Sequence, residues 1–254
     1  MIYADLKGKK ALVTGGASGL GLCTVELFAE MGAAVAMNDL PGNPRLKQQT
    51  KRLQAKGYNV VAAPADLQDP GMTEQMVHDA AKALGGIDFL INNAGHPITP
   101  VPIPAGDLKS QTEDFWQTVL SVNLLGTFRT VRAAESYLRK AKGAVVNTSS
   151  MAAVRAGGSS SPYSVAKGGI ITLTRELARG LSPDVRVNAI APQFVDPKDS
   201  NMPLKWDSLD EDVRVLPIPR PGTGREYAEV TLFLCAGASY MTGITIPVEG
   251  GYNC

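Results

Sequence analysis

Residues 11–23 read ALVTGGASGLGLC, and this stretch decides the fold class. A short apolar run is followed by the spaced glycines Gly15, Gly19 and Gly21 and then by a helical pattern. Glycines at such a turn permit a tight bend and a close approach of the backbone to a pyrophosphate at the positive end of the helix. A glycine-rich turn can also be purely structural. The order of strand, glycines and helix favours dinucleotide binding over that alternative.

The rest of the chain repeats the alternation of strand and helix. Short β-branched runs predict strands, and the longer periodic stretches between them predict helices. This alternation implies right-handed crossovers and a parallel sheet with helices on both faces, so the predicted fold class is α/β and doubly wound. The predicted strands are 11–15, 34–39, 59–66, 89–95, 144–150, 185–192 and 244–251, and the predicted helices include 20–32, 113–140 and 168–181.

Length and composition fit a single domain over residues 1–254. Hydrophobic residues make up 44% and charged residues 19% of the chain, which is an ordinary globular balance. Lys and Arg number 25 and Asp and Glu 24, so no net field favours a nucleic-acid or membrane partner. No apolar run suits a signal peptide or a transmembrane helix, and a cytoplasmic location is expected. The three cysteines form no CxxC pair and neither histidine lies near a carboxylate cluster, so no metal site is expected.

Two segments interrupt the alternation. Residues 96–107 carry four prolines, cannot hold a helix and are predicted to form a stiff loop. Residues 193–221 follow a predicted strand end and are predicted to form a lid over the substrate. Within this segment Phe194, Met202 and Trp206 are candidates for an apolar pocket wall.

A carboxylate ends the second predicted strand. Asp39 can accept hydrogen bonds from the adenosine ribose hydroxyls and would repel a 2′-phosphate. Ser18 and Leu40, where a phosphate-binding base would be expected, are uncharged, which favours NAD over NADP. Arg45 and Lys47 lie nearby and argue the other way. An ordinary strand-end carboxylate is the alternative for Asp39.

Several motifs together resemble the short-chain dehydrogenases/reductases. They are TGGASGLG at 14–21, ADL at 65–67, NNAG at 92–95, Asn123 in SVNLLG, NTSS at 147–150, YSVAK at 163–167 and VNAIAP at 187–192. The resemblance extends over nearly the whole chain through TGITIPVEGG. It implies one Rossmann-type domain with a seven-stranded parallel sheet, and a homo-oligomer, either dimer or tetramer.

The resemblance also carries roles to matching residues. Tyr163 would be the acid/base, Lys167 its activator, Asn123 the holder of a water in a proton relay and Ser150 the substrate-orienting hydroxyl. Asp66 and Leu67 would flank adenine, and Asn92 and Ala94 would lie along the adenosine and ribose. The implied cofactor contacts are Gly15, Ser18, Gly19, Leu20, Gly21, Asp39, Leu40, Asp66, Leu67, Asn93, Ala94, Gly95, Tyr163, Lys167, Pro192 and Val195.

The chemistry of the Tyr163 and Lys167 pair supports these roles independently. A free tyrosine with a pKa of about 10 is a poor base at neutral pH. A lysine cation one helical turn away and an oxidised nicotinamide would both favour the phenolate and lower that pKa.

Four residues depart from the family pattern or have open roles. Gln193 and Pro197 replace the usual glycine and threonine after VNAIAP, which removes a hydroxyl contact to the carboxamide and leaves the backbone of Val195. Gln193 faces either substrate or solvent. For His96 a structural hydrogen bond is favoured over a substrate contact. For Arg155 a solvated loop position is favoured over contact with an anionic substrate group.

Three functions compete. The leading hypothesis is NAD-dependent interconversion of a secondary alcohol and a ketone. The second is an NADPH-dependent reductase of 3-oxoacyl thioesters, against which Asp39 argues. The third is a non-catalytic nucleotide sensor or scaffold on the same fold, against which the complete set Asn123, Ser150, Tyr163 and Lys167 argues.

Overall fold

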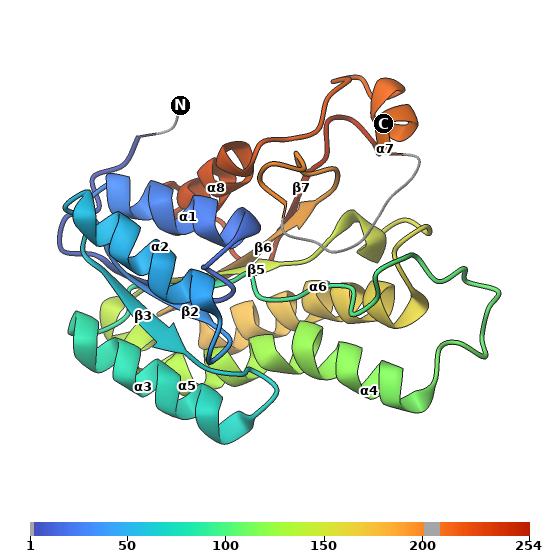
Figure 1. The fold of residues 1–254 in the computed structure, drawn as a ribbon. Coiled ribbons are helices and arrows are strands. Elements are labelled where there is room, and N and C mark those ends of the chain that lie inside the picture. The colour runs from blue at the N-terminus through green and yellow to red at the C-terminus, as the bar shows by residue number, and fades with distance from the viewer. Residues whose placement is uncertain (1–2, 201–208) are drawn as a thin grey trace.

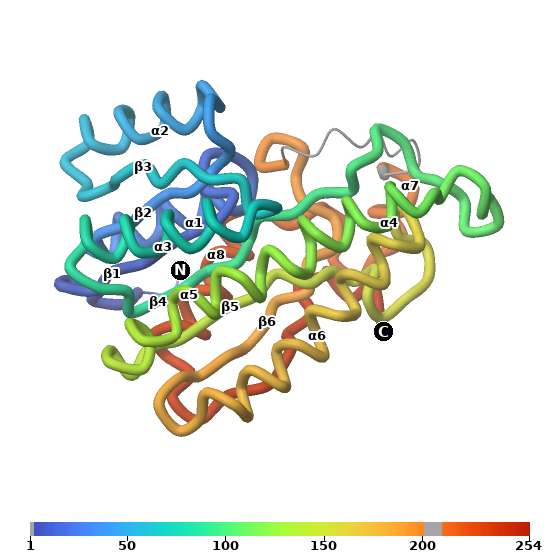
Figure 2. Tube along the Cα trace, turned by 90° about the horizontal axis from the view of Figure 1, so that it is seen from below, coloured from blue at the N-terminus to red at the C-terminus, as the bar shows by residue number. Residues whose placement is uncertain are grey.

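A parallel sheet forms the centre of the protein. The computed structural model describes residues 3–200 and 209–254, and within them seven strands lie in the order β3-β2-β1-β4-β5-β6-β7 (Figures 1 and 2). This confirms the predicted α/β class. The strands are β1 (Lys10–Val13), β2 (Ala34–Asp39), β3 (Val60–Pro64), β4 (Phe89–Asn92), β5 (Ala144–Thr148), β6 (Arg186–Pro192) and β7 (Thr245–Val248).

Helices cover both faces of this sheet. Helices α1 and α8 pack together on one face with α2, and α3, α5 and α6 lie on the other (Figure 1). The α-helices are α1 (Gly19–Glu30), α2 (Pro44–Ala55), α3 (Pro70–Leu84), α4 (Glu113–Leu120), α5 (Gly126–Ala141), α6 (Ser161–Leu181), α7 (Leu209–Arg214) and α8 (Gly224–Leu232). Shorter helical turns are η1 (Ser121–Leu125), η2 (Met151–Ala153) and η3 (Phe233–Gly237). No helix in the described ranges is long and apolar enough to cross a membrane.

The alternation of side chains along each strand builds two separate cores. In β1, Ala11 and Val13 join the cluster under α1 and α8, whereas Leu12 joins the cluster under α3 and α5. Successive strand residues point to opposite faces, and both faces are covered. The strands therefore read as continuous apolar runs rather than as alternating ones.

The predicted helix at 113–140 is interrupted. The π-helical turn η1 separates α4 from α5. Asn123 Nδ2 donates to the carbonyl of Val119 at 3.0 Å, which is the acceptor that the Asn123 backbone amide would use in a regular α-helix. This side-chain bond competes with the backbone ladder and accompanies the bulge. The apolar periodicity continues through the bulge, so the sequence pattern could not reveal it.

The chain reverses its winding between β1 and β4. Strand β1 pairs with β2 on one side and with β4 on the other. In open parallel sheets, ligands bind at the carboxyl ends of the strands beside such a switch point. The glycine turn after β1, Asn93 after β4, Ser150 after β5 and Pro192 at the end of β6 all lie along this edge.

Candidate functional site

The glycine turn presents the start of α1 to the crevice. Gly15 and Gly19 have positive φ values of 62° and 56°. Glycine adopts such values without strain, which explains its presence at these two positions. A Cβ on Gly21 would lie 2.1 Å from the carbonyl oxygen of Gly15, so α1 packs directly on the turn. Ser18 is the N-cap of α1, and its side chain makes no capping hydrogen bond. The amides of the first turn are thus placed to bind a pyrophosphate.

Residues after β4 hold this turn in place. Thr14 Oγ1 accepts hydrogen bonds from the amides of Asn93 and Ala94, both at 3.0 Å. Asn93 Nδ2 donates to the carbonyls of Thr14 and Gly15 at 3.3 Å. The Asn93 side chain therefore braces the glycine turn. The sequence analysis missed Thr14, although its place directly before the glycines was the available signal.

The side chain of Asn92 belongs to a buried chain of hydrogen bonds. It is buried, donates to Asn147 Oδ1 at 2.9 Å and accepts from Thr130 Oγ1 at 2.6 Å. Asn147 Nδ2 in turn donates to Thr174 Oγ1 at 3.0 Å. This buried chain joins α5, β4, β5 and α6, so the Asn92 side chain has a structural role, and its place along the adenosine stays a prediction.

The end of β2 holds a fixed carboxylate. Asp39 Oδ1 accepts hydrogen bonds from the Leu40 amide and from Asn43 Nδ2, both at 2.8 Å. Asn43 also caps α2, because its Oδ1 accepts from the Arg45 amide at 3.0 Å. The Asn-Pro pair at the start of α2 was the sequence signal for this brace. Both bonds to Asp39 use the same carboxylate oxygen.

The predicted adenine-side residues lie next to this carboxylate. The amide of Ala65 donates to the carbonyl of Asp39 at 3.0 Å, which ties the end of β3 to the end of β2. Asp66 is half-buried and accepts from the Gln68 amide at 2.9 Å, and Leu67 is buried. Asp39, Asp66 and Leu67 therefore share one end of the crevice.

The four predicted catalytic residues converge beside Gly95. A Cβ on Gly95 would lie 2.6 Å from Asn123 Oδ1 and 3.1 Å from Lys167 Nζ, so glycine keeps open the space between these two groups. Lys167 Nζ lies 5.7 Å from the centre of the Tyr163 ring and donates to the carbonyl of Thr148 at 2.9 Å. The Ser150 side chain lies close enough to the Tyr163 hydroxyl to lower its pKa.

Local capping and one buried serine place α6 for this contact. The helix begins at Ser161 rather than at 168, because Ser160 caps it by accepting from the Tyr163 amide at 3.3 Å. Tyr163 and Lys167 are four residues apart and share a helix face. Ser149 is buried, and its Oγ donates to the carbonyl of Lys167 at 2.8 Å. Ser149 therefore fastens α6 to the end of β5, a role that the sequence analysis did not assign.

Burial controls the titration of Tyr163 and Lys167. Burial raises the pKa of Tyr163 to about 12, against a smaller lowering by the nearby Ser150 hydroxyl. Burial lowers the pKa of Lys167 to about 8. Both shifts disfavour the charged form. A pKa of Tyr163 lowered by Lys167 was predicted, but in the protein without cofactor burial raises this pKa instead.

Asn123 presents an unused acceptor to the site. Its Nδ2 donates to the carbonyls of His96 and Val119, both at 3.0 Å. Its Oδ1 is buried and has no hydrogen-bond partner within residues 3–200 and 209–254. A buried acceptor of this kind calls for an ordered water. This fits the predicted relay role of Asn123.

The side chain of His96 makes the structural hydrogen bond that the sequence analysis favoured. Its Nδ1 accepts from the Ile98 amide at 3.1 Å. Burial lowers the pKa of His96, and the charge of Lys167 adds to this.

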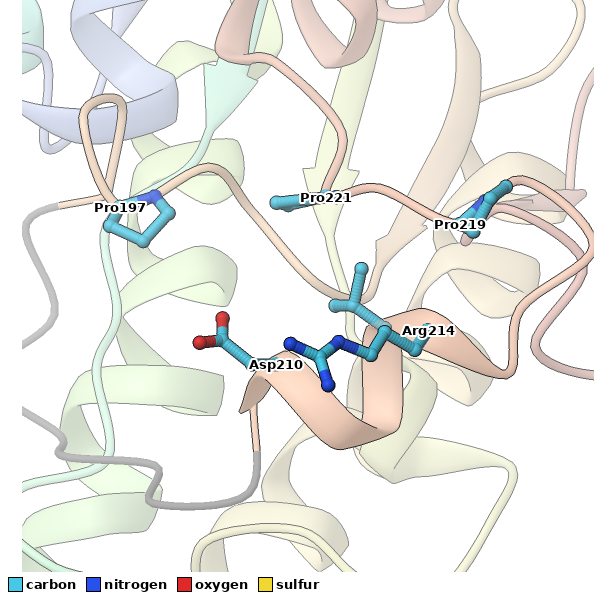
Figure 3. A pocket seen from close by; sticks show the side chains of 6 residues that line it. Pro197, Asp210, Arg214, Pro219 and Pro221 are labelled. Carbon is cyan, nitrogen blue, oxygen red and sulfur yellow. The ribbon is translucent and has the colours of Figure 1, made fainter.

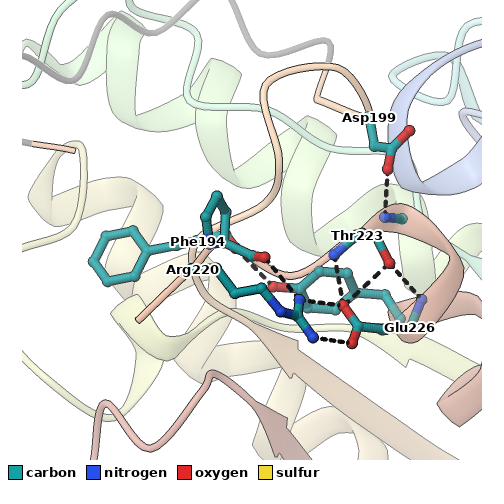
Figure 4. A network of polar contacts seen from close by, with 8 residues as sticks. Phe194, Asp199, Arg220, Thr223 and Glu226 are labelled. Atoms are coloured by element: carbon teal, nitrogen blue, oxygen red, sulfur yellow. Dashed lines mark hydrogen bonds and ion pairs between the residues drawn. The ribbon is translucent and has the colours of Figure 1, made fainter. Parts of the chain in front are cut away.

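The segment after β6 is fastened to α8. Val195 forms a parallel bridge with Gly222, and Tyr227 Oη donates to the carbonyl of Phe194 at 3.1 Å (Figure 4). Asp199 Oδ2 accepts from the Gly224 amide at 2.8 Å. Both ends of the predicted lid are therefore anchored where the structure describes them.

An ion pair and a capping box complete this anchor. Arg220 Nη2 lies 2.6 Å from Glu226 Oε1 (Figure 4). Glu226 Oε2 accepts from the Thr223 amide at 2.8 Å, and this capping box starts α8. The Arg220 bond and the Thr223 bonds together lower the pKa of Glu226 to about 2.

One residue of the predicted apolar wall, Phe194, lies in a small buried cluster. Phe194 is buried and packs with Val213, Leu216 and Tyr252, so it supports the segment itself. Met202 and Trp206 lie outside the described residues. A cavity of about 330 Å³ adjoins this cluster and contains none of the four predicted catalytic residues (Figure 3). Its lining consists of Pro197, Asp210, Val213, Arg214, Pro219 and Pro221.

The sheet order, the glycine turn and the residues around Gly95 define a class of protein, the nicotinamide-dependent oxidoreductases on a doubly wound sheet. Comparison with known proteins gives the family. Residues 15–253 match a family model described as enoyl-(acyl carrier protein) reductase. The chain belongs to the short-chain dehydrogenase/reductase family, to which a solved structure from Burkholderia xenovorans, 32% identical over 96% of this chain with a TM-score of 0.87, is also attributed.

Three similar proteins illustrate the range of this family. A (2S)-[(R)-hydroxy(phenyl)methyl]succinyl-CoA dehydrogenase subunit of Thauera aromatica is 34% identical, over 97% of both chains. A 3-oxoacyl-[acyl-carrier protein] reductase of Brucella melitensis with bound NAD has a TM-score of 0.85 and is 30% identical, over 100% of this chain and 97% of that one. A blue fluorescent protein from a metagenomic library in complex with NADPH has a TM-score of 0.87 and is 31% identical, over 99% and 100% of the two chains.

Proposed function

We propose that the protein is an NAD-dependent oxidoreductase that interconverts a secondary alcohol and a ketone, with Tyr163 as the acid/base. The nearness of the Ser150 hydroxyl to Tyr163, which lowers the pKa of Tyr163, supports this reaction class, because one hydroxyl can transfer a proton while the other orients the reacting oxygen. Lys167 lies beside the Tyr163 ring, and Gly95 leaves the adjacent space open.

The chain's residues would divide the reaction between them. In oxidation, Tyr163 takes the hydroxyl proton and Ser150 donates a hydrogen bond to the same oxygen. When bound beside these residues, a nicotinamide would supply the acceptor for the hydride that leaves the carbinol carbon. In reduction, Tyr163 returns its proton to the developing alkoxide. Asn123 Oδ1 and Lys167 Nζ flank Gly95, where a water between them would exchange protons with the Tyr163 hydroxyl.

The pKa of Tyr163 sets a requirement for the oxidation direction. Because burial raises this pKa to about 12, the tyrosine alone holds its proton at neutral pH. A positive charge in the crevice would stabilise the phenolate and lower the pKa. Cofactor binding would thus precede proton removal, and reduction would proceed with the tyrosine already protonated.

The NAD assignment rests on one observation, the fixed carboxylate of Asp39. Its two internal hydrogen bonds hold Oδ1 at the end of β2. A ribose hydroxyl can donate to such a carboxylate, whereas a 2′-phosphate would meet like charge. Ser18 and Leu40 contribute no cation at the neighbouring positions.

The second candidate is an NADPH-dependent reductase of 3-oxoacyl thioesters. It is supported by the names of several relatives, which are 3-oxoacyl-[acyl-carrier-protein] reductases. Arg45 in the first turn of α2 and the nearby Lys47 are the cations that could meet a 2′-phosphate. The third candidate, a non-catalytic nucleotide sensor, is disfavoured because all four predicted catalytic residues are present and close together.

Initial rates with matched cofactors test the proposal. A panel of secondary alcohols is assayed with NAD and NADP, and the corresponding ketones with NADH and NADPH. We expect a clear preference for NAD and NADH. Asp39→Asn keeps both internal hydrogen bonds but removes the charge, so the variant should use NADPH better relative to NADH. Asp79→Asn, on the exposed face of α3, removes the same charge as a control.

Two outcomes contradict the cofactor assignment. One is a preference of the unmodified protein for NADPH. The other is an unchanged NADH/NADPH ratio in Asp39→Asn. Absence of turnover with every cofactor, combined with tight binding of NAD, would favour the nucleotide sensor.

A further inference from the structure

A stack of three side chains links the loops that surround the proposed site. Arg155 follows β5, Phe194 follows β6 and Tyr252 follows β7. The Tyr252 ring meets the Phe194 ring edge-on at 5.4 Å, and the Arg155 guanidinium lies 4.6 Å from the centre of the Tyr252 ring. Arg155 Nη1 also donates to the carbonyl of Tyr252 at 2.9 Å. Arg155 is exposed in its loop, as predicted, but these contacts with Tyr252 hold its guanidinium in position.

This held cation has no carboxylate partner in the described part of the chain. Arg52, Arg139, Arg220 and Arg225 each form an ion pair with an acidic side chain, whereas the polar and cation-π contacts of Arg155 with residues 3–200 and 209–254 are to the carbonyl and the ring of Tyr252. A guanidinium has five N–H donors, and one of them bonds to that carbonyl. The remaining donors keep the fork geometry that fits a carboxylate or phosphate.

The backbone of Arg155 lies close to that of Ser150, one of the proposed reacting groups. Ser150 precedes η2, and the Arg155 amide donates to the carbonyl of Met151 at 3.0 Å, so the backbone between them is compact. At the 3₁₀ rise of roughly 2 Å per residue, the α-carbons of Ser150 and Arg155 lie within about 10 Å of one another. A substrate whose oxygen contacts Ser150 could thus extend a short carbon chain to Arg155.

We propose that Arg155 binds an oxyanion, either a carboxylate or a phosphate, at the end of the substrate remote from the reacting carbon. This inference rests on the proposed function and adds a substrate class to it, namely hydroxy and oxo acids or thioesters with a charged carrier group. Tyr252 is the positioning residue, because its ring and its carbonyl orient the guanidinium. A purely structural staple of the C-terminal residues to the β5 loop is the competing explanation for Arg155.

Matched charged and neutral substrates separate these explanations. One pair is 5-oxohexanoate and its methyl ester, and the other is acetoacetyl-CoA and the acetoacetyl thioester of N-acetylcysteamine. Kinetics are measured for the unmodified protein, Arg155→Gln and Arg155→Lys. The control is Arg175→Gln, which removes the same charge from an exposed position of α6, twelve residues beyond Tyr163 and therefore about 18 Å along the helix.

For at least one charged substrate, Arg155→Gln should raise KM by about tenfold or more, as expected for losing a charged hydrogen bond, with kcat within about twofold. KM for its neutral partner should not change. Arg155→Lys should restore part of the affinity, and Arg175→Gln should behave as the unmodified protein. The pair that responds identifies the anion as carboxylate or phosphate. High salt should raise KM for the charged substrate in the unmodified protein.

The proposal would be overturned if Arg155→Gln changed KM equally for the charged and the neutral substrate of each pair. It would also be overturned if KM changed for neither pair. Binding distinguishes this failure from failure of the proposed function. Pentanoate and pentanamide are titrated calorimetrically into the protein in the presence of NADH. Arg155-dependent binding of pentanoate without any turnover would sustain the anion site and reject the oxidoreductase. Turnover without Arg155-dependent anion binding would sustain the oxidoreductase and reject the anion site.

Discussion

Replacing Lys167 with methionine should change how stability depends on pH. Lys167 is buried in α6, and its Nζ donates to the carbonyl of Thr148 at 2.9 Å. Burial lowers its pKa from 10.5 to about 8. At neutral pH the native protein therefore holds a charge in a poorly solvated position. Lys167→Met keeps a long side chain of good helix propensity and removes that charge.

The size of the effect follows from the two pKa values. The difference between 10.5 and about 8 corresponds to a cost of roughly 3 kcal/mol for the charged form at pH 7. Between those pKa values the unfolded chain binds more protons than the native one, so raising the pH stabilises the native state. By pH 10 the remaining cost is about 1 kcal/mol, and about 2 kcal/mol of stability is regained.

Urea denaturation followed by far-UV circular dichroism measures this change. The unmodified protein, Lys167→Met and Lys167→Arg are compared at pH 7 and pH 10, at one protein concentration and without cofactor. Relative to Lys167→Met, the unmodified protein should gain about 2 kcal/mol between the two pH values. The arginine of Lys167→Arg stays charged from pH 7 to pH 10. The difference in unfolding free energy between Lys167→Arg and Lys167→Met should therefore be the same at both pH values.

The reasoning would be refuted if the difference in unfolding free energy between the unmodified protein and Lys167→Met were the same at pH 7 and pH 10. That result would mean that Lys167 titrates in the native state as it does in the unfolded chain. The reasoning would also fail if Lys167→Arg gained about 2 kcal/mol of unfolding free energy relative to Lys167→Met between pH 7 and pH 10. A charge that does not titrate cannot make stability depend on pH in this way.

Three further predictions concern the site. Tyr163→Phe should reduce kcat by at least about 10²-fold and keep NADH affinity, measured by fluorescence titration; unchanged turnover would reject the acid/base role. Gly21→Ala should lower stability by about 1–3 kcal/mol and weaken NADH binding, because its methyl group meets the Gly15 carbonyl, whereas Gly180→Ala, in open space, should do neither. Ser149→Ala should lower the free energy of unfolding by about 1 kcal/mol in urea denaturation, and no loss would show that its bond to Lys167 is dispensable.

The fold was predictable because its signals are local. Apolar runs between helical stretches marked every strand of the described sheet, and the glycine turn marked the edge where ligands bind. The strand ends were less well placed. The first predicted strand ran to residue 15, whereas β1 ends at Val13, because Thr14 and Gly15 belong to the turn held by Asn93.

Other features depend on residues that are distant in the sequence. The π turn at Asn123 accompanies a side-chain bond to the backbone, and the hydrogen bond from Ser149 to Lys167 joins a strand end to a helix. Phe194 looked like a pocket wall by residue type, but the tertiary structure packs it against Val213 and Leu216. No period or spacing in the chain encodes these contacts.

The sequence by itself determined the α/β fold, the family and the set of residues to expect at the site, because motif spacing and strand alternation are properties of the chain. Only the tertiary structure decided that burial raises the pKa of Tyr163 and lowers that of Lys167, since desolvation depends on everything packed around a group. The tertiary structure also placed Arg155 against Tyr252, 97 residues away. That contact exists because parallel strands bring their following loops to one edge of the sheet.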